Sequence, residues 1–168
     1  MIVFVDESNS SEKTLFRRYS YSAIGLPAFT KSVLRKSTRC SVLPALDIHG
    51  YIPGSALIVE GSVTQLIFEH WLEFTVLPQM HPYPCYERSV LVMDNCSTHH
   101  SDKITQLCAQ RGVKLVYLSP YSPHFNPIEL TFHLLKQWMR RHRSLAPQWG
   151  CDSYTSRWIE FLRMACEQ

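Results

Sequence analysis

Two short apolar runs stand out along the chain, and each of them stops at a carboxylate. Val90–Met93 is followed by Asp94, and Met1–Val5 is followed by Asp6. A short unbroken apolar run is typical of a strand buried on both faces of a sheet, although a buried helical segment gives the same pattern. The Ser- and Thr-rich residues soon after Asp94 favour a strand end. Open α/β sheets place their chemistry at this edge, so both aspartates are candidate site residues.

The rest of the chain alternates strand-like and helix-like segments. Strands are predicted over 38–47, 51–60 and 113–118, with a tight turn at His49-Gly50 between the first two. Helices are predicted after a Ser62/Gln65 capping box and ending before Pro78, from Ser101 to Gly112, and from Pro127 to about Arg143. Their expected inward residues are Ile67, Trp71 and Phe74, then Ile104, Leu107 and Cys108, then Leu130, Leu134, Leu135 and Trp138. This order predicts an α/β fold with a mixed five-stranded sheet flanked by helices.

Length and composition indicate one ordinary globular domain, because the 168 residues are 45% hydrophobic and 18% charged. A net charge of +3 is permissive for nucleic-acid binding without proving it. The six cysteines form no C-x-x-C pair, so we expect reduced thiols in an intracellular compartment. The sequence has no signal-peptide pattern and no apolar run long enough to cross a bilayer, so no membrane partner is expected.

Glu129 joins the two aspartates as a third candidate, at the start of a predicted helix that follows a proline-rich loop. If the first and fourth strands are neighbours, Asp6 and Asp94 lie side by side and repel each other when ionised. Divalent cations would neutralise such a group, and two Mg²⁺ ions about 4 Å apart promote phosphodiester displacement. Each carboxylate alone is better explained as a turn residue or a first-turn helix residue. Only together do the three indicate a shared metal site.

Two blocks around these carboxylates resemble the catalytic core of mariner-type DDE transposases. The blocks are Val92-Met-Asp94-Asn95-Cys-Ser-Thr-His99 and Tyr121-Ser-Pro-His-Phe-Asn126-Pro-Ile-Glu129. The family has a D-N-x-x-x-H block and a Y-S-P-x-x-N-P-I-E block, with 34 residues between its last two acidic residues, as in this chain. Phe4-Val-Asp6-Glu7-Ser8 is similar to the family's first acidic block.

The resemblance implies a ribonuclease H-like catalytic domain over residues 1–143. Residues 144–168 are expected to form a C-terminal extension, in which Trp158, Phe161 and Leu162 indicate a short helix. It implies metal-dependent cleavage and strand transfer of DNA, with two Mg²⁺ ions, replaceable by Mn²⁺, held by Asp6, Asp94 and Glu129. The implied partners are transposon-end and target DNA, and a homodimer is one option. Nuclear localisation follows from the resemblance alone.

Further residues are expected to support this chemistry. Asn95, His99 and Asn126 would order the loops beside the carboxylates or contact the site, whereas Glu7 is interpreted as a solvated or turn residue. Lys136, Arg140 and Arg143 follow Glu129 at intervals of seven, four and three residues, so they are predicted to share its helix face. That face suits DNA phosphates, and a plain solvated helix face is an equal alternative.

Two other functions stay open. Family members carry helix-turn-helix DNA-binding modules before the catalytic domain, whereas this sequence starts at the first catalytic strand. An inactive transposon remnant, or a co-opted domain that binds DNA or protein, is therefore the main alternative. A ribonuclease H-like nuclease that acts on RNA or hybrids is a weaker hypothesis.

Overall fold

The computed structural model describes residues 2–16, 19–29, 39–84, 86–96, 99–120, 122–147 and 153–167. Its strands are β1 (Ile2–Val5), β2 (Ser8–Ser11), β3 (Arg39–Leu43), β4 (Ala45–Asp47), β5 (Gly50–Tyr51), β6 (Leu57–Glu60), β7 (Val90–Met93) and β8 (Lys114–Tyr117). Its α-helices are α1 (Gln65–Trp71), α2 (Asp102–Arg111), α3 (Ile128–Arg141) and α4 (Tyr154–Cys166). The shorter helices are η1 (Glu12–Leu15), η2 (Leu72–Val76), η3 (Leu77–Gln79), η5 (Pro123–Phe125) and η6 (Arg143–Leu145). Among these described helices, none has the length and apolar character needed to cross a membrane.

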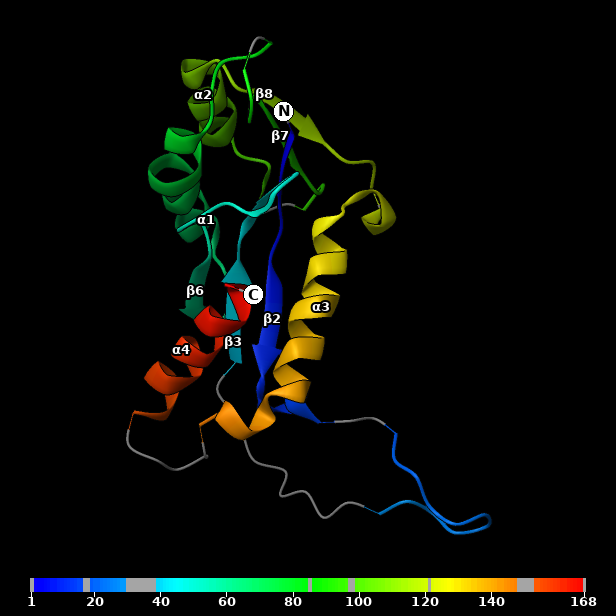
Figure 1. Ribbon diagram of the computed structural model, residues 1–168. Coiled ribbons are helices and arrows are strands. Elements are labelled where there is room, and N and C mark those ends of the chain that lie inside the picture. The colour runs from blue at the N-terminus through cyan, green and yellow to red at the C-terminus, as the bar shows by residue number, and fades with distance from the viewer. Residues whose placement is uncertain are drawn as a thin grey trace.

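The main sheet has five strands in the order β5-β4-β1-β7-β8. β1 pairs antiparallel with β4 and parallel with β7, and β7 pairs parallel with β8. α1 and α2 lie on the left of this sheet in Figure 1, whereas α3 begins on its right-hand side and continues downward beside β2. The predicted mixed five-stranded sheet flanked by helices is therefore confirmed.

A second sheet, in the order β2-β3-β6, continues the first one. Val5 of β1 pairs with Ala45 of β4, and Ser8 of β2 pairs with Val42 of β3. The first partner is three residues later and the second three residues earlier in the chain, so the antiparallel register is the same in the two sheets. The ladder is interrupted at Pro44, which has no N–H to donate and which separates β3 from β4. The predicted strand 38–47 is therefore two strands, and β1 and β2 likewise separate at Asp6 and Glu7.

The predicted strand 51–60 is also divided, into β5 and β6. A turn at Pro53-Gly54 lies between them, and Gly54 adopts a φ of +72° that suits glycine. The tight turn before β5 is at Ile48-His49, one residue earlier than predicted, because Asp47 pairs with Gly50. These divisions assign β5 to the main sheet and β6 to the second one.

The helix caps agree with the prediction for α2 and differ for α1. Ser101 caps α2 by accepting a hydrogen bond from the Ile104 N–H at 3.2 Å, and Gly112 ends it with a φ of +69°. The N-cap of α1 is Thr64, so the predicted Ser62/Gln65 capping box is wrong. Thr64 is the nearer hydroxyl to the first helical turn, and its side chain accepts the amide hydrogen bond instead.

The inward faces of α1 and α3 differ in part from the predicted stripes. Trp71 is buried, but Phe74 is 62% exposed, because the π-helical turn η2 rotates the side chains that follow α1. Leu130 and Leu134 are 72% and 61% exposed. The buried residues of α3 are Ile128, Phe132, Leu135 and Met139. The stripe is displaced because Phe132 and Met139, rather than the two leucines, fill the space beside the sheets and α4.

The helix α4 completes a core on the lower sheet (Figure 1). It buries Trp158, Phe161 and Leu162 in one cluster with Val42 of β3 and Met139 of α3. Arg143–Leu145 forms the short turn η6 after α3. The division into a domain over 1–143 and an extension over 144–168 stays a prediction.

The two caps provide a matched test of the fold. Ser101→Ala is expected to lower the free energy of unfolding by roughly 0.5–2 kcal/mol, because it removes the side-chain acceptor at the start of α2. Ser62→Ala is expected to change it by less than about 0.5 kcal/mol, because Ser62 is exposed and caps no helix. Urea unfolding of both variants and the unchanged chain measures the difference. Equal losses in the two variants would contradict the assigned caps.

Candidate catalytic site

The strand register brings the two aspartates to one edge of the main sheet. Val5 of β1 pairs with Met93 of β7, and Met93 pairs in turn with Tyr117 of β8. Asp6 and Asp94 directly follow Val5 and Met93, so both lie at the carboxyl ends of neighbouring parallel strands. The predicted neighbourhood of the first and fourth strands is thereby confirmed.

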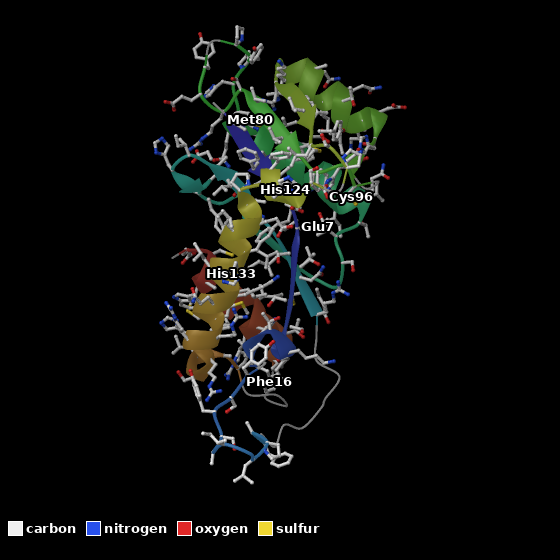
Figure 2. The ribbon with its side chains drawn as sticks, turned by 90° about the vertical axis from the view of Figure 1, so that its right-hand side faces the viewer. Glu7, Phe16, Met80, Cys96, His124 and His133 are labelled. Carbon is white, nitrogen blue, oxygen red and sulfur yellow. The ribbon has the colours of Figure 1, made fainter. Side chains whose placement is uncertain are left out.

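Glu129 reaches the same place from the first turn of α3. Asp6, Asp94 and Glu129 line one cavity of about 560 Å³ together with Asn95, Cys96, Leu118, Ser119, Pro120, Ser122 and Asn126. The helix start is fixed by the loop before it, because the Asn126 carbonyl accepts a hydrogen bond from the Glu129 N–H at 3.2 Å. In Figure 2, Glu7, Cys96 and His124 lie at the level of this first turn of α3.

Asp6 is a buried carboxylate with a hydrogen bond to each oxygen. The Glu7 N–H donates to its Oδ1 at 2.7 Å, and the Asn126 Nδ2 donates to its Oδ2 at 3.0 Å. Burial raises the pKa of Asp6 to about 7, against the lowering effect of the Glu7 N–H, and the negative charges of Asp94, Glu129 and Glu7 raise it further. Asp6 therefore lies where an added positive charge would be stabilising.

Asp94 is held by a buried histidine. His99 Nδ1 lies 2.6 Å from Asp94 Oδ1, and His99 Nε2 lies 3.2 Å from Glu7 Oε2. The hydrogen bond to His99 lowers the pKa of Asp94, more than burial raises it. Burial alone would lower the pKa of His99, but the hydrogen bonds and charges of Asp94 and Glu7 raise it to about 10. His99 is therefore an imidazolium that donates to both carboxylates.

The interpretation of Glu7 as a solvated or turn residue is wrong, since it lies against His99. Two further contacts of His99 were not predicted. The Phe68 ring lies 4.2 Å from the His99 ring, and the Tyr117 hydroxyl donates to the His99 carbonyl at 2.8 Å. The position of Tyr117 near His99 could have been inferred from the order of the strands. Tyr117 ends β8, and it pairs with Met93, which directly precedes Asp94. Nothing in the sequence near Phe68 indicates its contact with His99.

The other predicted support residues lie as follows. Asn95 is exposed and pairs through its Oδ1 with His100 Nε2, five residues further along the chain. Asn126 is 2% exposed, and its Oδ1 has no hydrogen-bond partner among the described residues although its Nδ2 contacts Asp6. A buried amide oxygen without a partner is costly, so this atom is suited to a ligand or a water.

The predicted basic residues do not all lie on one helix face. Lys136 and Arg140 belong to α3, and their spacing places them on the side that carries Glu129. Arg143 lies beyond the helix end, in η6, because α3 stops at Arg141. The prediction that Arg143 shares a helix face with Lys136 and Arg140 is therefore wrong.

The described residues contain no three His, Cys, Asp or Glu side chains already close enough to form a metal-binding group. The chemistry of the cavity nevertheless fits a hard divalent cation. Three carboxylates line it, one of them has a pKa raised by burial and by its neighbours' charge, and a buried amide oxygen beside it is unpaired. Oxygen donors of this kind are the ligands that Mg²⁺ and Mn²⁺ prefer.

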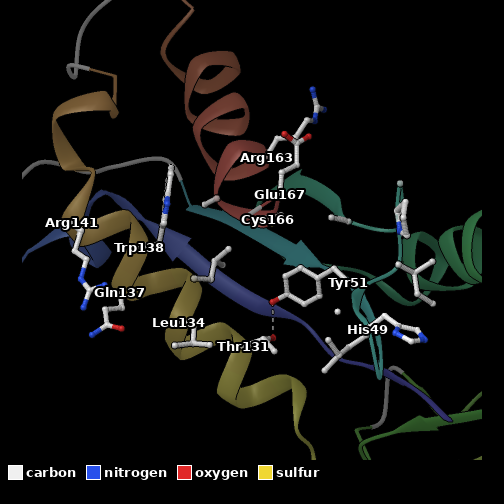
Figure 3. A pocket seen from close by; sticks show the side chains of 18 residues that line it. His49, Tyr51, Thr131, Leu134, Gln137, Trp138, Arg141, Arg163, Cys166 and Glu167 are labelled. Carbon is white, nitrogen blue, oxygen red and sulfur yellow. Dashed lines mark hydrogen bonds between the residues drawn. The ribbon is translucent and has the colours of Figure 1, made fainter. Parts of the chain in front are cut away.

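A larger cavity, of about 910 Å³, lies between α3, α4 and the β4–β5 hairpin (Figure 3). Its walls include Tyr51 and Trp138, and the Tyr51 hydroxyl lies 2.6 Å from Thr131 Oγ1. The side chains of Arg141 and Arg163 point away from each other, so they do not converge on one ligand (Figure 3). None of the three candidate carboxylates lines this cavity, so the candidate chemistry belongs to the smaller one.

The mixed sheet, with carboxylates at the carboxyl ends of its inner parallel strands, is that of a ribonuclease H-like fold. A family model described as DDE superfamily endonuclease matches residues 1–148. The chain therefore belongs to the DDE superfamily of endonucleases. Among curated protein sequences, none matches this chain.

Solved structures share its fold. The Mos1 mariner paired end complex with Mn matches with a TM-score of 0.64 and 15% identity over 99% of this chain and 51% of that chain. The Mos1 strand transfer complex matches with a TM-score of 0.62 and 17% identity over 99% and 50%. The catalytic core domain of BIV integrase matches with a TM-score of 0.50 and 15% identity over 96% and 80%. The chain spans about half the length of the Mos1 chains.

The raised pKa of Asp6 predicts a pH-dependent effect of Asp6→Asn in metal-free buffer. The folded protein keeps the Asp6 proton up to about pH 7, whereas the unfolded chain releases it near its ordinary value of 3.8, so this residue costs stability as pH rises through that window. The uncharged amide of the variant carries no such cost. The gain in unfolding free energy from the substitution is expected to grow by roughly 2–3 kcal/mol between pH 5 and pH 8.

Urea unfolding with a chelator at both pH values measures this gain. Asp102→Asn is the control, because Asp102 is an exposed aspartate in the first turn of α2. A gain for Asp6→Asn that is the same at pH 5 and pH 8 would contradict the raised pKa.

Proposed function

We propose that this chain is the catalytic core of a transposase, which cleaves DNA phosphodiester bonds and transfers the resulting 3′ ends to target DNA in a metal-dependent reaction. The observation that carries this proposal is the meeting of Asp6, Asp94 and Glu129, which are far apart in the sequence, in one cavity. Membership of an endonuclease family supports the cleavage step. The shared fold with the Mos1 strand transfer complex supports the second step.

The proposed cofactor is a pair of Mg²⁺ ions, for which Mn²⁺ can substitute, held by Asp6, Asp94 and Glu129. Such ions, when bound, activate the attacking oxygen and stabilise the leaving oxygen of an in-line displacement. The cavity of about 560 Å³ leaves room for a phosphodiester beside the carboxylates. No covalent bond between protein and DNA is needed, because positioning and charge neutralisation supply most of the rate enhancement.

The chain's own residues fix the geometry of this reaction. Asn126 and the Glu7 N–H hold the two oxygens of Asp6, and His99 holds one oxygen of Asp94. The neighbouring loop residues Ser119 and Ser122 line the same cavity. Ser119 offers a hydroxyl group to phosphate oxygens, whereas the Ser122 hydroxyl donates to the Pro120 carbonyl at 3.3 Å. The attacking group would therefore meet a site in which two of the three carboxylates are already oriented.

DNA is proposed to approach along the side of α3 that begins at Glu129. Lys136 and Arg140 on α3 and Arg143 in η6 supply positive charge beyond the carboxylates. Cations of this kind bind the sugar-phosphate backbone without regard to sequence. A second copy of the chain is part of the proposal, because the matched Mos1 structure is a paired end complex. The nucleus is the proposed compartment, since the proposed substrate is transposon DNA.

The first test is nicking of supercoiled DNA in Mg²⁺ or Mn²⁺ by the purified chain. Asp6→Asn, Asp94→Asn and Glu129→Gln are each expected to reduce the rate by at least about 100-fold, because each removes a charged oxygen ligand. Asp102→Asn, at an exposed position on α2, is expected to keep the full rate. Equal nicking by the unchanged chain and Asp94→Asn would refute the assignment. DNA binding without metal-dependent nicking would favour a co-opted binding domain.

The second test concerns the basic residues. The variant with Lys136→Gln, Arg140→Gln and Arg143→Gln is expected to bind duplex DNA more weakly at every sequence. The slope of log K against log salt concentration is expected to become shallower by about three, one for each lost phosphate contact. Fluorescence anisotropy titrations at several salt concentrations measure both quantities.

The matched control removes the same charge elsewhere, with Lys103→Gln, Arg111→Gln and Lys114→Gln on α2 and β8. This control is expected to change the slope by less than about one. Indistinguishable slopes in the two triple variants would show that net charge alone, and not the path along α3 and η6, determines DNA binding.

A further inference from the structure

The oxygens of Asp94 differ in how much of their bonding capacity is used. Oδ1 accepts from His99 Nδ1 at 2.6 Å and from the Cys96 N–H at 3.2 Å. A carboxylate oxygen offers about two lone-pair sites, so these two contacts fill Oδ1. The described residues make no such hydrogen bond to Oδ2. Asp94 therefore presents one oxygen, rather than two, to anything that enters the cavity.

The hydrogen bond between His99 and Asp94 is maintained because three other groups fix the position of His99. Its Nε2 lies 3.2 Å from Glu7 Oε2, its ring lies 4.2 Å from that of Phe68, and its carbonyl accepts from the Tyr117 hydroxyl at 2.8 Å. The side chain is 1% exposed. We refer to Glu7 and His99 together as the Glu7–His99 clamp. His99 cannot turn away from Asp94 without breaking its contact with Glu7.

Asp6 is oriented by hydrogen bonds but is restricted less than Asp94. Its Oδ1 accepts from the Glu7 N–H at 2.7 Å and its Oδ2 accepts from Asn126 Nδ2 at 3.0 Å. Each oxygen keeps about one lone-pair site, and the two point along directions already set by protein donors. A cation that bound both oxygens of Asp6 at once would have to use the one site that remains on each oxygen, beside a protein donor.

Divalent cations differ in how they use carboxylates. Ca²⁺ takes six to eight oxygen ligands in flexible geometry and often binds a carboxylate through both oxygens, whereas Mg²⁺ requires near-ideal octahedral geometry with shorter bonds. A site in which Asp94 offers one oxygen suits the smaller octahedral ion. Two-oxygen binding by Asp94 is blocked as long as His99 and the Cys96 N–H occupy Oδ1.

We propose that the Glu7–His99 clamp is a metal-selectivity device, which restricts Asp94 to one free oxygen and thereby favours Mg²⁺ and Mn²⁺ over Ca²⁺. Glu7 is in this sense a positioning residue, since it acts through His99. The inference rests on the proposed function, because it requires the cavity to bind a divalent cation. It adds a role for two residues that are not among the proposed ligands.

Competition binding on the full chain tests the clamp. Bound Mn²⁺ is measured by electron paramagnetic resonance, and Mg²⁺ or Ca²⁺ is added to displace it. The concentration ratio of Ca²⁺ to Mg²⁺ needed for half displacement is expected to fall by about tenfold in Glu7→Ala and in His99→Leu, as for other residues that orient metal ligands. Glu7→Gln retains an oxygen that accepts from His99, so its ratio is expected to match the unchanged chain.

The ratio separates geometry from charge, because Mg²⁺ and Ca²⁺ have the same charge and respond alike to the loss of a carboxylate. Glu12→Ala, which removes a carboxylate from η1, is the control and is expected to leave the ratio unchanged. Circular dichroism identifies a variant that fails to fold, and Glu7→Ala, at a half-buried position, then decides without His99→Leu. If every variant binds Mn²⁺ and has the same ratio of Ca²⁺ to Mg²⁺ for half displacement as the unchanged chain, the clamp is overturned and the proposed function stays intact. No Mn²⁺ binding by the unchanged chain would overturn both.

Discussion

The parallel pairing of β1 with β7 is the interaction on which the site depends. It sets Val5 opposite Met93, and therefore sets Asp6 beside Asp94 where the two strands end. Successive side chains of a strand point to opposite faces, so a slip by one residue would send one aspartate to the other side of the sheet. The register is fixed by burial, because Val3, Val5, Leu91 and Met93 fill the core between the sheet and the helices α1 and α2.

Placing carboxylates together in a partly buried cavity has an energetic cost, and the structure offsets it unequally. Asp94 receives a histidine, which lowers its pKa, whereas Asp6 receives only neutral donors and has its pKa raised to about 7. The two aspartates are neighbours in the sheet, yet their environments separate their protonation behaviour. The remaining unfavourable charge is on the Asp6 side, where the unpaired oxygen of Asn126 also lies. A bound cation there would stabilise both groups.

Much of this arrangement could be predicted because it follows from local rules. An apolar run that ends at a carboxylate predicts a strand end, and the loop before Glu129 predicts a helix start, so the three carboxylates were identified from the sequence. Faces and contacts were predicted less well. The π-helical turn that exposes Phe74 is indicated by no spacing in the sequence, whereas the interruption at Pro44 follows from a proline that the predicted strand 38–47 did not take into account. The contact of Glu7 with His99 joins residues 92 positions apart, which no periodicity indicates.

The three carboxylates also differ in how firmly they are held. Asp6 and Asp94 are fixed by strand pairing and by hydrogen bonds, whereas the exposed side chain of Glu129 makes no hydrogen bond or ion pair with the described residues. The backbone of Glu129 is nevertheless anchored, through the carbonyl of Asn126, to the residue that holds Asp6. A ligand that entered the cavity would therefore need to reorient only the side chain of Glu129, while the backbone of Glu129 stays in place. This division explains how the carboxylates can line one cavity without forming a preassembled metal-binding group.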